Sequence, residues 1–226
     1  MSTNPAPTRC VVVVPVKPPK LGKTRLVGPI DAGLPDDVRR DLAEAFALDT
    51  VQAAVATPGA DVVLVVTDDF RLAASMRDLG AEVMPDGTSD DLNATLVQAA
   101  AEVVRRWPGA VPVALCADLP GLRPIELAGV LREVLDRASA GDAAVFVRDL
   151  VGTGTTLYAA PGAGFAPMFG PASAERHAGA GAVEVGTDAT SVRRDVDDAA
   201  DLDAALVAGV GPHTSRASGR RATPEG

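Results

Sequence analysis

Four cationic side chains closely follow a run of four valines near the start of the chain. The valines occupy residues 11–14, Pro15 follows them, and the cations are Lys17, Lys20, Lys23 and Arg25. A run of β-branched residues favours a strand covered on both faces, and proline, which cannot donate sheet hydrogen bonds, ends it. Ligands of open α/β sheets bind beyond the carboxyl ends of the strands. The stretch therefore predicts a loop that binds nucleotide phosphates; the alternative is an ordinary solvated cationic loop.

The cationic loop does not carry the P-loop motif, although residues 22–24 read Gly-Lys-Thr. That motif requires a glycine five positions earlier, where this chain has Lys17. Residues 18 and 19 are prolines, which lack the backbone N–H groups that would cradle phosphates. We expect Lys17, Lys23 and Arg25 to bind a polyphosphate with their side chains instead, with Arg25 able to make paired hydrogen bonds.

Two aspartates are the candidate metal ligands. Asp118 follows the apolar run 112–116, at the sheet edge expected for the cationic loop, and Asp197 lies in an acidic cluster with Asp195 and Asp198. If the C-terminal part folds back over this edge, Asp118 and Asp197 converge, and neighbouring carboxylates repel unless a proton or a cation lies between them. Oxygen ligands beside a phosphate substrate favour Mg²⁺. A helix cap for Asp118 and a solvated helix start for the cluster remain alternatives.

Composition narrows the class of protein. The chain has 226 residues, 47% of them hydrophobic, only 3% aromatic, and a formal net charge of −9. Such a charge disfavours nucleic acid and anionic membranes as partners, and few aromatics disfavour base-stacking platforms. Two cysteines in apolar surroundings indicate buried thiols in a reducing compartment. Because no apolar run approaches the ~20 residues of a membrane span and no secretory pattern opens the chain, we expect a cytoplasmic protein.

The apolar pattern alternates between the two regular periods. Strands are expected over residues 11–15, 61–66, 81–84, 112–116 and 143–147, and helices over residues 36–57, 70–79, the stretch after 89–90, and the stretch after 124. This order predicts a Rossmann-like α/β fold with a mainly parallel sheet and helices on both faces. We expect one domain over residues 1–208 and a disordered tail over residues 209–226, where small polar residues replace the apolar pattern.

The pattern changes after Arg148. Residues 149–156 are rich in glycine and threonine, and strands expected near residues 156–160 and 182–185 predict antiparallel pairing at the sheet edge. The loop at residues 152–156 is not a dinucleotide-binding fingerprint; its amides and hydroxyls either bind an anion or form a plain connection. His177 is one of two histidines, and no catalytic role is assigned to it. Without a Ser-His-Asp arrangement, zinc-ligand spacing or a reactive cysteine, we expect chemistry driven by metal and cations.

Seven short motifs occur in one order along the chain: VPVK at 14–17, GKTRL at 22–26, DLN at 91–93, ADLP at 117–120, GTGT at 152–155, FGPAS at 169–173 followed by His177, and DVD at 195–197. Together they resemble the phosphoenolpyruvate / 2-phospho-L-lactate guanylyltransferases of coenzyme F420 biosynthesis. The resemblance runs from about residue 11 to residue 206. It implies a single-domain nucleotidyltransferase fold related to the GT-A glycosyltransferases, with GTP and Mg²⁺ in its cleft.

The resemblance also implies roles for individual residues. Asp118 and Asp197 match the metal ligands, while Thr155, Gly170 and Ser173 match the positions that bind the three-carbon phosphate. Asn93 matches a position that contacts the nucleotide. The implied reaction is attack of a phosphate oxygen of phosphoenolpyruvate, or of 2-phospho-L-lactate, on the α-phosphorus of GTP, with release of pyrophosphate that Lys17, Lys23 and Arg25 stabilise. The Ala-, Val- and Arg-rich composition resembles that of actinobacterial members of the family, for which the resemblance implies phosphoenolpyruvate. Direct transfer of a labile product to the next pathway enzyme stays open.

Three other functions stay open at this point. The first is another nucleotidyltransferase of the same fold, acting on a sugar phosphate or a molybdopterin. The second is a glycosyltransferase, which would usually show Asp-x-Asp at the strand end where this chain has residues 117–120 as ADLP. The third is a non-catalytic nucleotide-binding protein, which would bind GTP and release no pyrophosphate.

Overall fold

The computed structural model describes residues 9–16, 36–87, 91–141 and 144–221. Its strands are β1 (Arg9–Pro15), β2 (Ala60–Val66), β3 (Glu82–Met84), β4 (Ala110–Leu115), β5 (Val145–Arg148), β6 (Thr155–Ala159) and β7 (Val183–Glu184). Its helices are α1 (Asp36–Val55), α2 (Phe70–Asp78), α3 (Leu92–Arg106), α4 (Pro124–Ala140), α5 (Ser173–Gly179), α6 (Thr190–Arg193), α7 (Ala199–Ala208) and α8 (Pro212–Arg221), with a short 3₁₀ turn, η2, at Gly162–Gly164.

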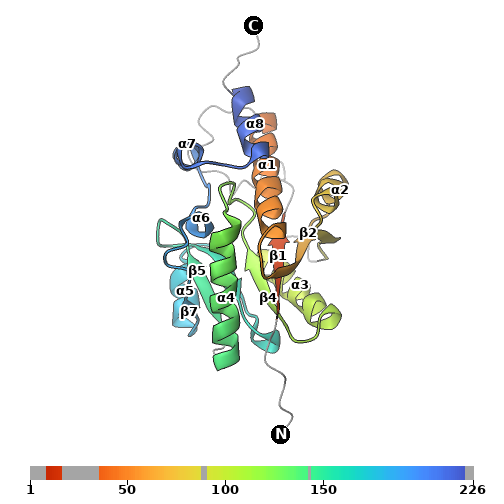
Figure 1. Ribbon diagram of the computed structural model, residues 1–226, viewed down its shortest axis with the longest axis vertical. Helices are drawn as coiled ribbons and strands as arrows, with labels where there is room; N and C mark the ends of the chain where they lie inside the picture. Colours follow the sequence, from red (N-terminus) through yellow and green to blue (C-terminus); the bar gives the residue numbers. More distant parts are fainter. Residues whose placement is uncertain (1–8, 17–35, 88–90, 142–143, 222–226) are drawn as a thin grey trace.

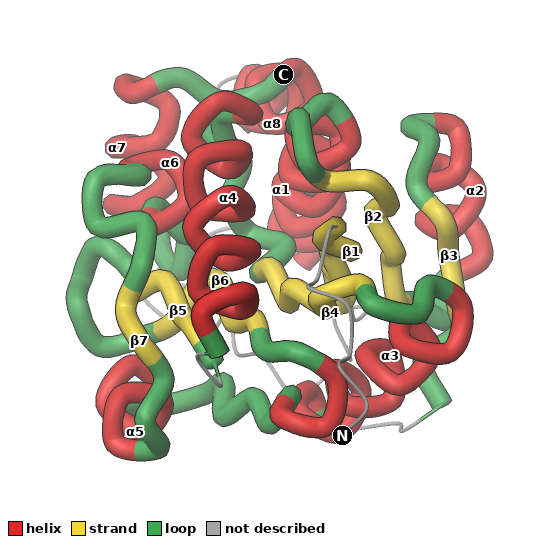
Figure 2. The backbone as a smooth tube through the Cα atoms, turned by 60° about the horizontal axis from the view of Figure 1, so that its bottom comes forward, coloured by secondary structure: helices red, strands yellow, loops and turns green. Residues whose placement is uncertain are grey.

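The described strands form one mixed sheet between two layers of helices. Seven strands lie in the order β3-β2-β1-β4-β6-β5-β7. Figure 2 shows α1 and α4 on one side of this sheet and α3 and α5 on the other. The predicted α/β fold with helices on both faces is therefore confirmed, and β1 lies next to the middle of the sheet, where the valine run predicted a strand covered from both sides.

The valine run forms β1 because its alternate side chains fill two separate cores. Cys10, Val12 and Val14 pack with residues of α1 and α4, and Val11 and Val13 pack with residues of α3. β1 pairs in parallel with β2 on one side and with β4 on the other. Parallel neighbours bring their carboxyl ends to one edge, so the segments after Pro15 and Leu115 begin on the same side of the sheet.

The sequence predicted antiparallel pairing at the edge of the sheet. The antiparallel strand β6 instead lies inside the sheet, between β4 and β5. β6 pairs antiparallel with both β4 and β5. The loop after β5 turns the chain back as a hairpin, and β6 fills the position beside β4 that a crossover strand would otherwise take. This inserted strand brings Thr155 next to the end of β4, where the Cys116 amide donates to the carbonyl of Thr156 at 2.9 Å.

Most of the segment expected to be a disordered tail is a helix. α8 packs along α1, as Figure 1 shows at the C-terminal end of the fold, and Thr214 and Ala217 are buried there. The buried carboxylate of Asp49 on α1 accepts hydrogen bonds from the amides of His213 and Thr214 at 3.0 and 2.7 Å. The local sequence of this segment has no apolar pattern that predicts a helix. The helix is held instead by α1, which is distant in the sequence. Within the described ranges, no helix combines the length and apolar character of a membrane span.

Candidate active site

Asp118 and the segment of Asp197 meet at the carboxyl edge of the sheet. The Val196 amide donates to the carbonyl of Asp118 at 3.0 Å, so the C-terminal segment folds back over the end of β4. Thr50 on α1 fixes the same loop, because its hydroxyl donates to the Ala117 carbonyl at 3.1 Å and accepts from the Leu119 amide at 3.1 Å. The convergence expected from the sequence is present, and it rests on backbone contacts on both sides of Asp118.

Burial and nearby negative charge raise the pKa values of the carboxylates at this edge. Asp195 and Asp197 flank Val196, which is fully buried. Asp195 lies close enough to Asp118 and Asp197 for their charges to act on it. Burial and the charge of Asp197 raise the pKa of Asp118 to about 7. Burial and the charges of Asp118 and Asp197 raise the pKa of Asp195 to about 8. Loss of water, together with Asp201, also raises the pKa of Asp197. We call Asp118, Asp195 and Asp197 the carboxylate edge.

Helix capping does not account for the carboxylate edge. The N-cap of α4 is Arg123, which makes no side-chain capping bond, so Asp118 does not cap that helix. At α7 the capping residue is Asp198, which forms a capping box with Asp201. The acidic cluster thus divides into a helix start, formed by Asp198 and Asp201, and two aspartates, Asp195 and Asp197, that lie near Asp118. The alternative of a helix start therefore holds for Asp198, which caps α7, while Asp197 is not the capping residue.

One atom of the carboxylate edge points to a cation. The Oδ1 of Asp118 is inaccessible to solvent and has no hydrogen-bond partner among the residues that the structure describes. A buried carboxylate oxygen without a partner carries a large desolvation cost. Among the described residues, no three carboxylate, thiolate or imidazole groups are arranged to hold a metal ion by themselves. Two aspartates nevertheless suit Mg²⁺, which usually binds one or two carboxylates and takes its other ligands from substrate phosphates and water.

The second half of the site is centred on His177, a residue without an assigned role in the sequence. His177 is fully buried on α5. Its Nδ1 lies 3.0 Å from the Thr155 hydroxyl at the start of β6, and its Nε2 accepts from the Met168 amide at 2.8 Å. The imidazole therefore connects Thr155 with the segment that leads to Gly170 and Ser173. The sequence offered one signal for it, since His177 follows Ser173 by four positions and so shares its face of the helix.

Asn93 holds the same segment from the other side. Its Nδ2 donates to the carbonyl of Phe169 at 3.1 Å, and its Oδ1 accepts from the Phe169 amide at 2.8 Å. Gly170 follows with φ 125°, and Ala172 takes φ 52°, so the turn into α5 uses left-handed backbone at both positions. We call the assembly of Asn93, Thr155, His177 and residues 168–173 the acceptor loops. Gly170 and buried Ser173 lie in one turn, whose carbonyl and amide are joined at 3.1 Å.

The amides of the glycine-rich loop are not directed at a ligand. The carboxylate of Asp149, 5% exposed, accepts hydrogen bonds from the amides of Gly152, Thr153 and Gly154. The Thr153 carbonyl accepts from the Ala174 amide at the start of α5. The loop therefore forms a rigid connection between β5 and β6 that supports Thr155. The sequence left two interpretations of this loop open, anion binding and a plain connection. The bonds of its amides to Asp149 favour the plain connection.

The cationic loop lies outside the described residues, and with it Lys17, Lys23 and Arg25. The last residue described before it is Val16, whose amide donates to the carbonyl of Val66 at 2.9 Å. The described part of this segment therefore ends at the edge where Asp118 lies. No contact of the three cations is described, and their roles stay predictions.

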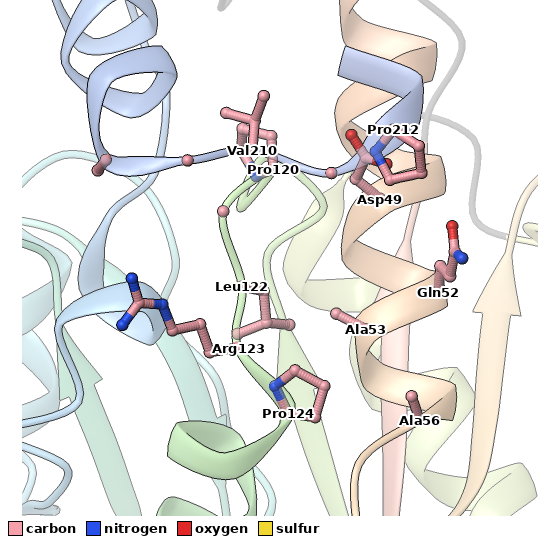
Figure 3. Close-up of a pocket in the computed structure, with 14 residues that line it drawn as sticks. Asp49, Gln52, Ala53, Ala56, Pro120, Leu122, Arg123, Pro124, Val210 and Pro212 are labelled. Carbon is pink, nitrogen blue, oxygen red and sulfur yellow. The ribbon is translucent and has the colours of Figure 1, made fainter. Parts of the chain in front are cut away.

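A cavity of about 390 Å³ lies elsewhere in the described structure. Figure 3 shows it between α1, the loop from Pro120 to Pro124, and the link from α7 to α8. None of the described residues predicted for metal, nucleotide or acceptor binding lines it, and its buried carboxylate, Asp49, is hydrogen-bonded to the start of α8. The cavity is thus separate from the candidate site.

Three comparisons relate the chain to known proteins. A family model described as "Guanylyl transferase CofC like" matches residues 10–217. A phosphoenolpyruvate guanylyltransferase of Streptomyces scabiei is 47% identical over 94% of this chain and 97% of its own length, and one of Streptomyces coelicolor is 46% identical over 92% and 95%. A solved structure from Desulfovibrio desulfuricans G20, assigned as a nucleotide-diphospho-sugar transferase, has the same fold, with a TM-score of 0.58, 17% identity, and coverage of 87% and 85%.

Proposed function

Because the chain belongs to the family of CofC-like guanylyl transferases, we propose that it transfers GMP from GTP to phosphoenolpyruvate and releases pyrophosphate, in coenzyme F420 biosynthesis. The names of the relatives favour phosphoenolpyruvate over 2-phospho-L-lactate as the acceptor. The observation that carries the proposal is the buried Oδ1 of Asp118, which has no partner within the described part of the chain. A cation bound beside this carboxylate would offset the cost of burying that oxygen.

The metal of the proposed reaction is Mg²⁺, held by Asp118 and Asp197. When bound, it supplies positive charge that lowers the repulsion between two anionic substrates. The chain's own contribution is to fix the two carboxylates: the Asp118 carbonyl is bonded to Val196, and Thr50 fixes the loop on the other side. Preorganised ligands of this kind cost no rearrangement when the substrates arrive.

The acceptor binds at the acceptor loops in this proposal, through Thr155, Gly170 and Ser173. A phosphate monoester has its second pKa at about 6, so near neutral pH it is already an adequate nucleophile. No general base is needed, and the neutral His177 is not required to take a proton. The chain therefore has to orient the acceptor phosphate and exclude water rather than move a proton.

Lys17, Lys23 and Arg25 bind the leaving pyrophosphate in this proposal. They follow β1 in the sequence, and β1 ends at the edge that carries Asp118. Asn93 contacts the nucleotide in addition to holding Phe169. Cations placed where negative charge develops stabilise the transition state, and removal of one such contact costs about 10²–10³ in rate.

The direct test is to incubate the protein with GTP, Mg²⁺ and one acceptor at a time, with the next pathway enzyme present to capture the product. The acceptors are phosphoenolpyruvate, 2-phospho-L-lactate and a sugar 1-phosphate, and the products are identified by mass. We expect pyrophosphate and a guanylylated three-carbon product with phosphoenolpyruvate. Product with the sugar phosphate alone would contradict the proposal, and GTP binding without pyrophosphate from any acceptor would indicate a non-catalytic binding protein.

A further inference from the structure

The buried imidazole of His177 has a defined proton arrangement. A backbone amide can only donate, so the Met168 N–H bonded to Nε2 at 2.8 Å requires Nε2 to be an acceptor without a proton. A neutral imidazole then carries its single proton on Nδ1, which faces the Thr155 hydroxyl at 3.0 Å. The ring therefore donates to Thr155. An imidazolium is disfavoured here, since its Nε2 proton would point at the proton of the Met168 amide.

The surroundings of the ring keep it neutral and fixed. Burial, together with the nearby charge of Arg176, lowers the pKa of His177 to about 4. Tyr158 stacks on the ring at 4.6 Å between centroids, and Phe146 and Phe169 lie at 5.8 and 5.7 Å. Three aromatic neighbours leave the imidazole little room to flip. Its two nitrogens thus keep their separate partners across the neutral pH range.

The arrangement decides what the Thr155 hydroxyl can do. A hydroxyl that accepts a hydrogen bond from Nδ1 directs its own proton away from the ring, toward a further acceptor. A chain of hydrogen bonds in one direction strengthens each member, so Thr155 becomes a better donor. An anionic oxygen of a phosphate or carboxylate is the partner that suits such a donor. The opposite tautomer would require Thr155 to donate to the ring and would leave only lone pairs for the ligand.

We propose that His177 is a positioning residue that fixes Thr155 as a hydrogen-bond donor to an anionic oxygen of the acceptor substrate. This inference rests on the proposed function, because it assigns Thr155 to the acceptor. His177 itself does not touch the substrate and exchanges no proton during the reaction. Its second bond, to Met168, sets the start of the segment that carries Gly170 and Ser173, so one ring aligns both parts of the acceptor loops.

The tautomer can be observed without substrate. Selective ¹⁵N labelling of histidine and NMR of the ring nitrogens at neutral pH should show a protonated Nδ1 and an unprotonated Nε2 for His177. His213, the second histidine of the chain, is assigned separately with a His213→Gln variant. A protonated Nε2, or an imidazolium near neutral pH, would overturn the inference whatever the activity of the protein.

Two substitutions separate the two bonds of the ring. In His177→Asn the amide nitrogen takes the place of Nδ1 and can still donate to Thr155, and in His177→Gln the amide oxygen takes the place of Nε2 and can still accept from Met168. We expect His177→Gln to raise the KM for phosphoenolpyruvate about tenfold, the worth of one oriented hydrogen bond, with the KM for GTP unchanged. His177→Asn keeps the donor to Thr155 and loses only the bond to Met168, so its rise in the KM for phosphoenolpyruvate should be smaller.

Combination with Thr155→Val provides the decisive comparison. If His177 acts through the Thr155 hydroxyl, His177→Gln should not raise the acceptor KM further once that hydroxyl is gone. Additive effects, or an equal rise in the KM for GTP, would mean that His177 only supports the fold and would overturn the inference. If the wild-type protein does not turn over phosphoenolpyruvate, the proposed function fails and the acceptor role of Thr155 fails with it. A protonated Nε2 in an active enzyme instead overturns the inference alone.

Discussion

The carboxylate edge and the acceptor loops satisfy their polar groups in opposite ways. At the carboxylate edge, Asp118 has a buried oxygen without a partner among the described residues, and burial together with neighbouring carboxylates raises the pKa values of Asp118 and Asp195. In the acceptor loops, both nitrogens of His177 and both amide atoms of Asn93 have partners at 2.8–3.1 Å. One region carries unmet negative charge, and the other is neutral and complete.

The difference separates two tasks within one site. Unmet charge binds a ligand of opposite charge, and the fold tolerates the repulsion only because the rest of the protein is stable enough to hold the carboxylates together. A complete network binds nothing by itself, but it holds a few remaining donors in a fixed geometry. The proposed reaction needs both properties. The carboxylate edge has to keep its charge available for a cation, and the acceptor loops have to be in their binding conformation before the substrate arrives.

The largest expected effect comes from Asp118→Asn. The amide is nearly isosteric but carries no charge, so we expect turnover of GTP with phosphoenolpyruvate to fall by about 10²-fold or more. In the absence of metal the same variant should be more stable than the wild type near pH 8, because it removes a buried charge from the carboxylate edge. Initial rates and thermal unfolding in the presence of a chelator check the two expectations.

The pH dependence of this stability gain follows from the raised pKa. The folded-state pKa of Asp118 is about 7 against an ordinary value of 3.8, so the native state binds more protons than the unfolded state between these values. Stability of the wild type therefore falls as pH rises through this window. The advantage of Asp118→Asn should be full above about pH 7 and absent below about pH 4. A variant that is less stable than wild type at pH 8 would contradict this account of the carboxylate edge.

A smaller effect is expected in the acceptor loops, from Asn93→Ala. The change removes both hydrogen bonds to the backbone of Phe169 and so loosens the turn that carries Gly170. We expect the KM for phosphoenolpyruvate to rise about tenfold. A rise in the KM for GTP in the same variant tests the proposed nucleotide contact of Asn93. Gln98→Ala, at an exposed position on the same helix, is the matched control.

An unchanged acceptor KM in Asn93→Ala would mean that the acceptor loops keep their shape without this contact. Unlike Asp118→Asn, this variant should also be less stable than the wild type at every pH, because two partly buried hydrogen bonds are lost and no repulsion is relieved. The two substitutions thus shift stability in opposite directions, as expected for a strained region and a complete one.

The parts of the fold that could be predicted from the sequence depend on local pattern. The valine run marked β1 because β-branched residues covered on both faces leave a continuous apolar signature. Asp118 could be located because it follows a buried strand, and strands that are parallel end at one edge. The convergence with Asp197 required only that the C-terminal segment return to that edge, where the Val196 amide now binds the Asp118 carbonyl.

The parts that could not be predicted depend on partners far away in the chain. β6 lies inside the sheet because it pairs with β4 as well as with β5, and its pattern does not distinguish that place from an edge. The role of His177 depends on its hydrogen bonds with Thr155 and Met168, and the spacing of residues in the sequence does not predict these contacts. The glycine-rich loop directs its amides to Asp149, so a composition typical of anion binding serves an internal carboxylate instead.

Asp49→Asn gives the smallest expected effect and the sharpest contrast with Asp118→Asn. Asp49 is 4% exposed, yet its carboxylate accepts from two amides at the start of α8, where the helix dipole favours a negative charge. An amide keeps one acceptor oxygen and loses the charge, so we expect the free energy of unfolding to fall by about 1–2 kcal/mol. Turnover should be unchanged, since the hydrogen bonds of the Asp49 carboxylate go to α8 and to none of the proposed site residues that the structure describes. Denaturant unfolding measures the change, and Glu44→Gln, at an exposed position of the same helix, controls for the loss of charge.

The same Asp-to-Asn change would then stabilise the protein where the carboxylate lacks donors and destabilise it where two donors are present. A gain in stability from Asp49→Asn near pH 8 would show that general negative charge, rather than the missing partner of Asp118, strains the carboxylate edge.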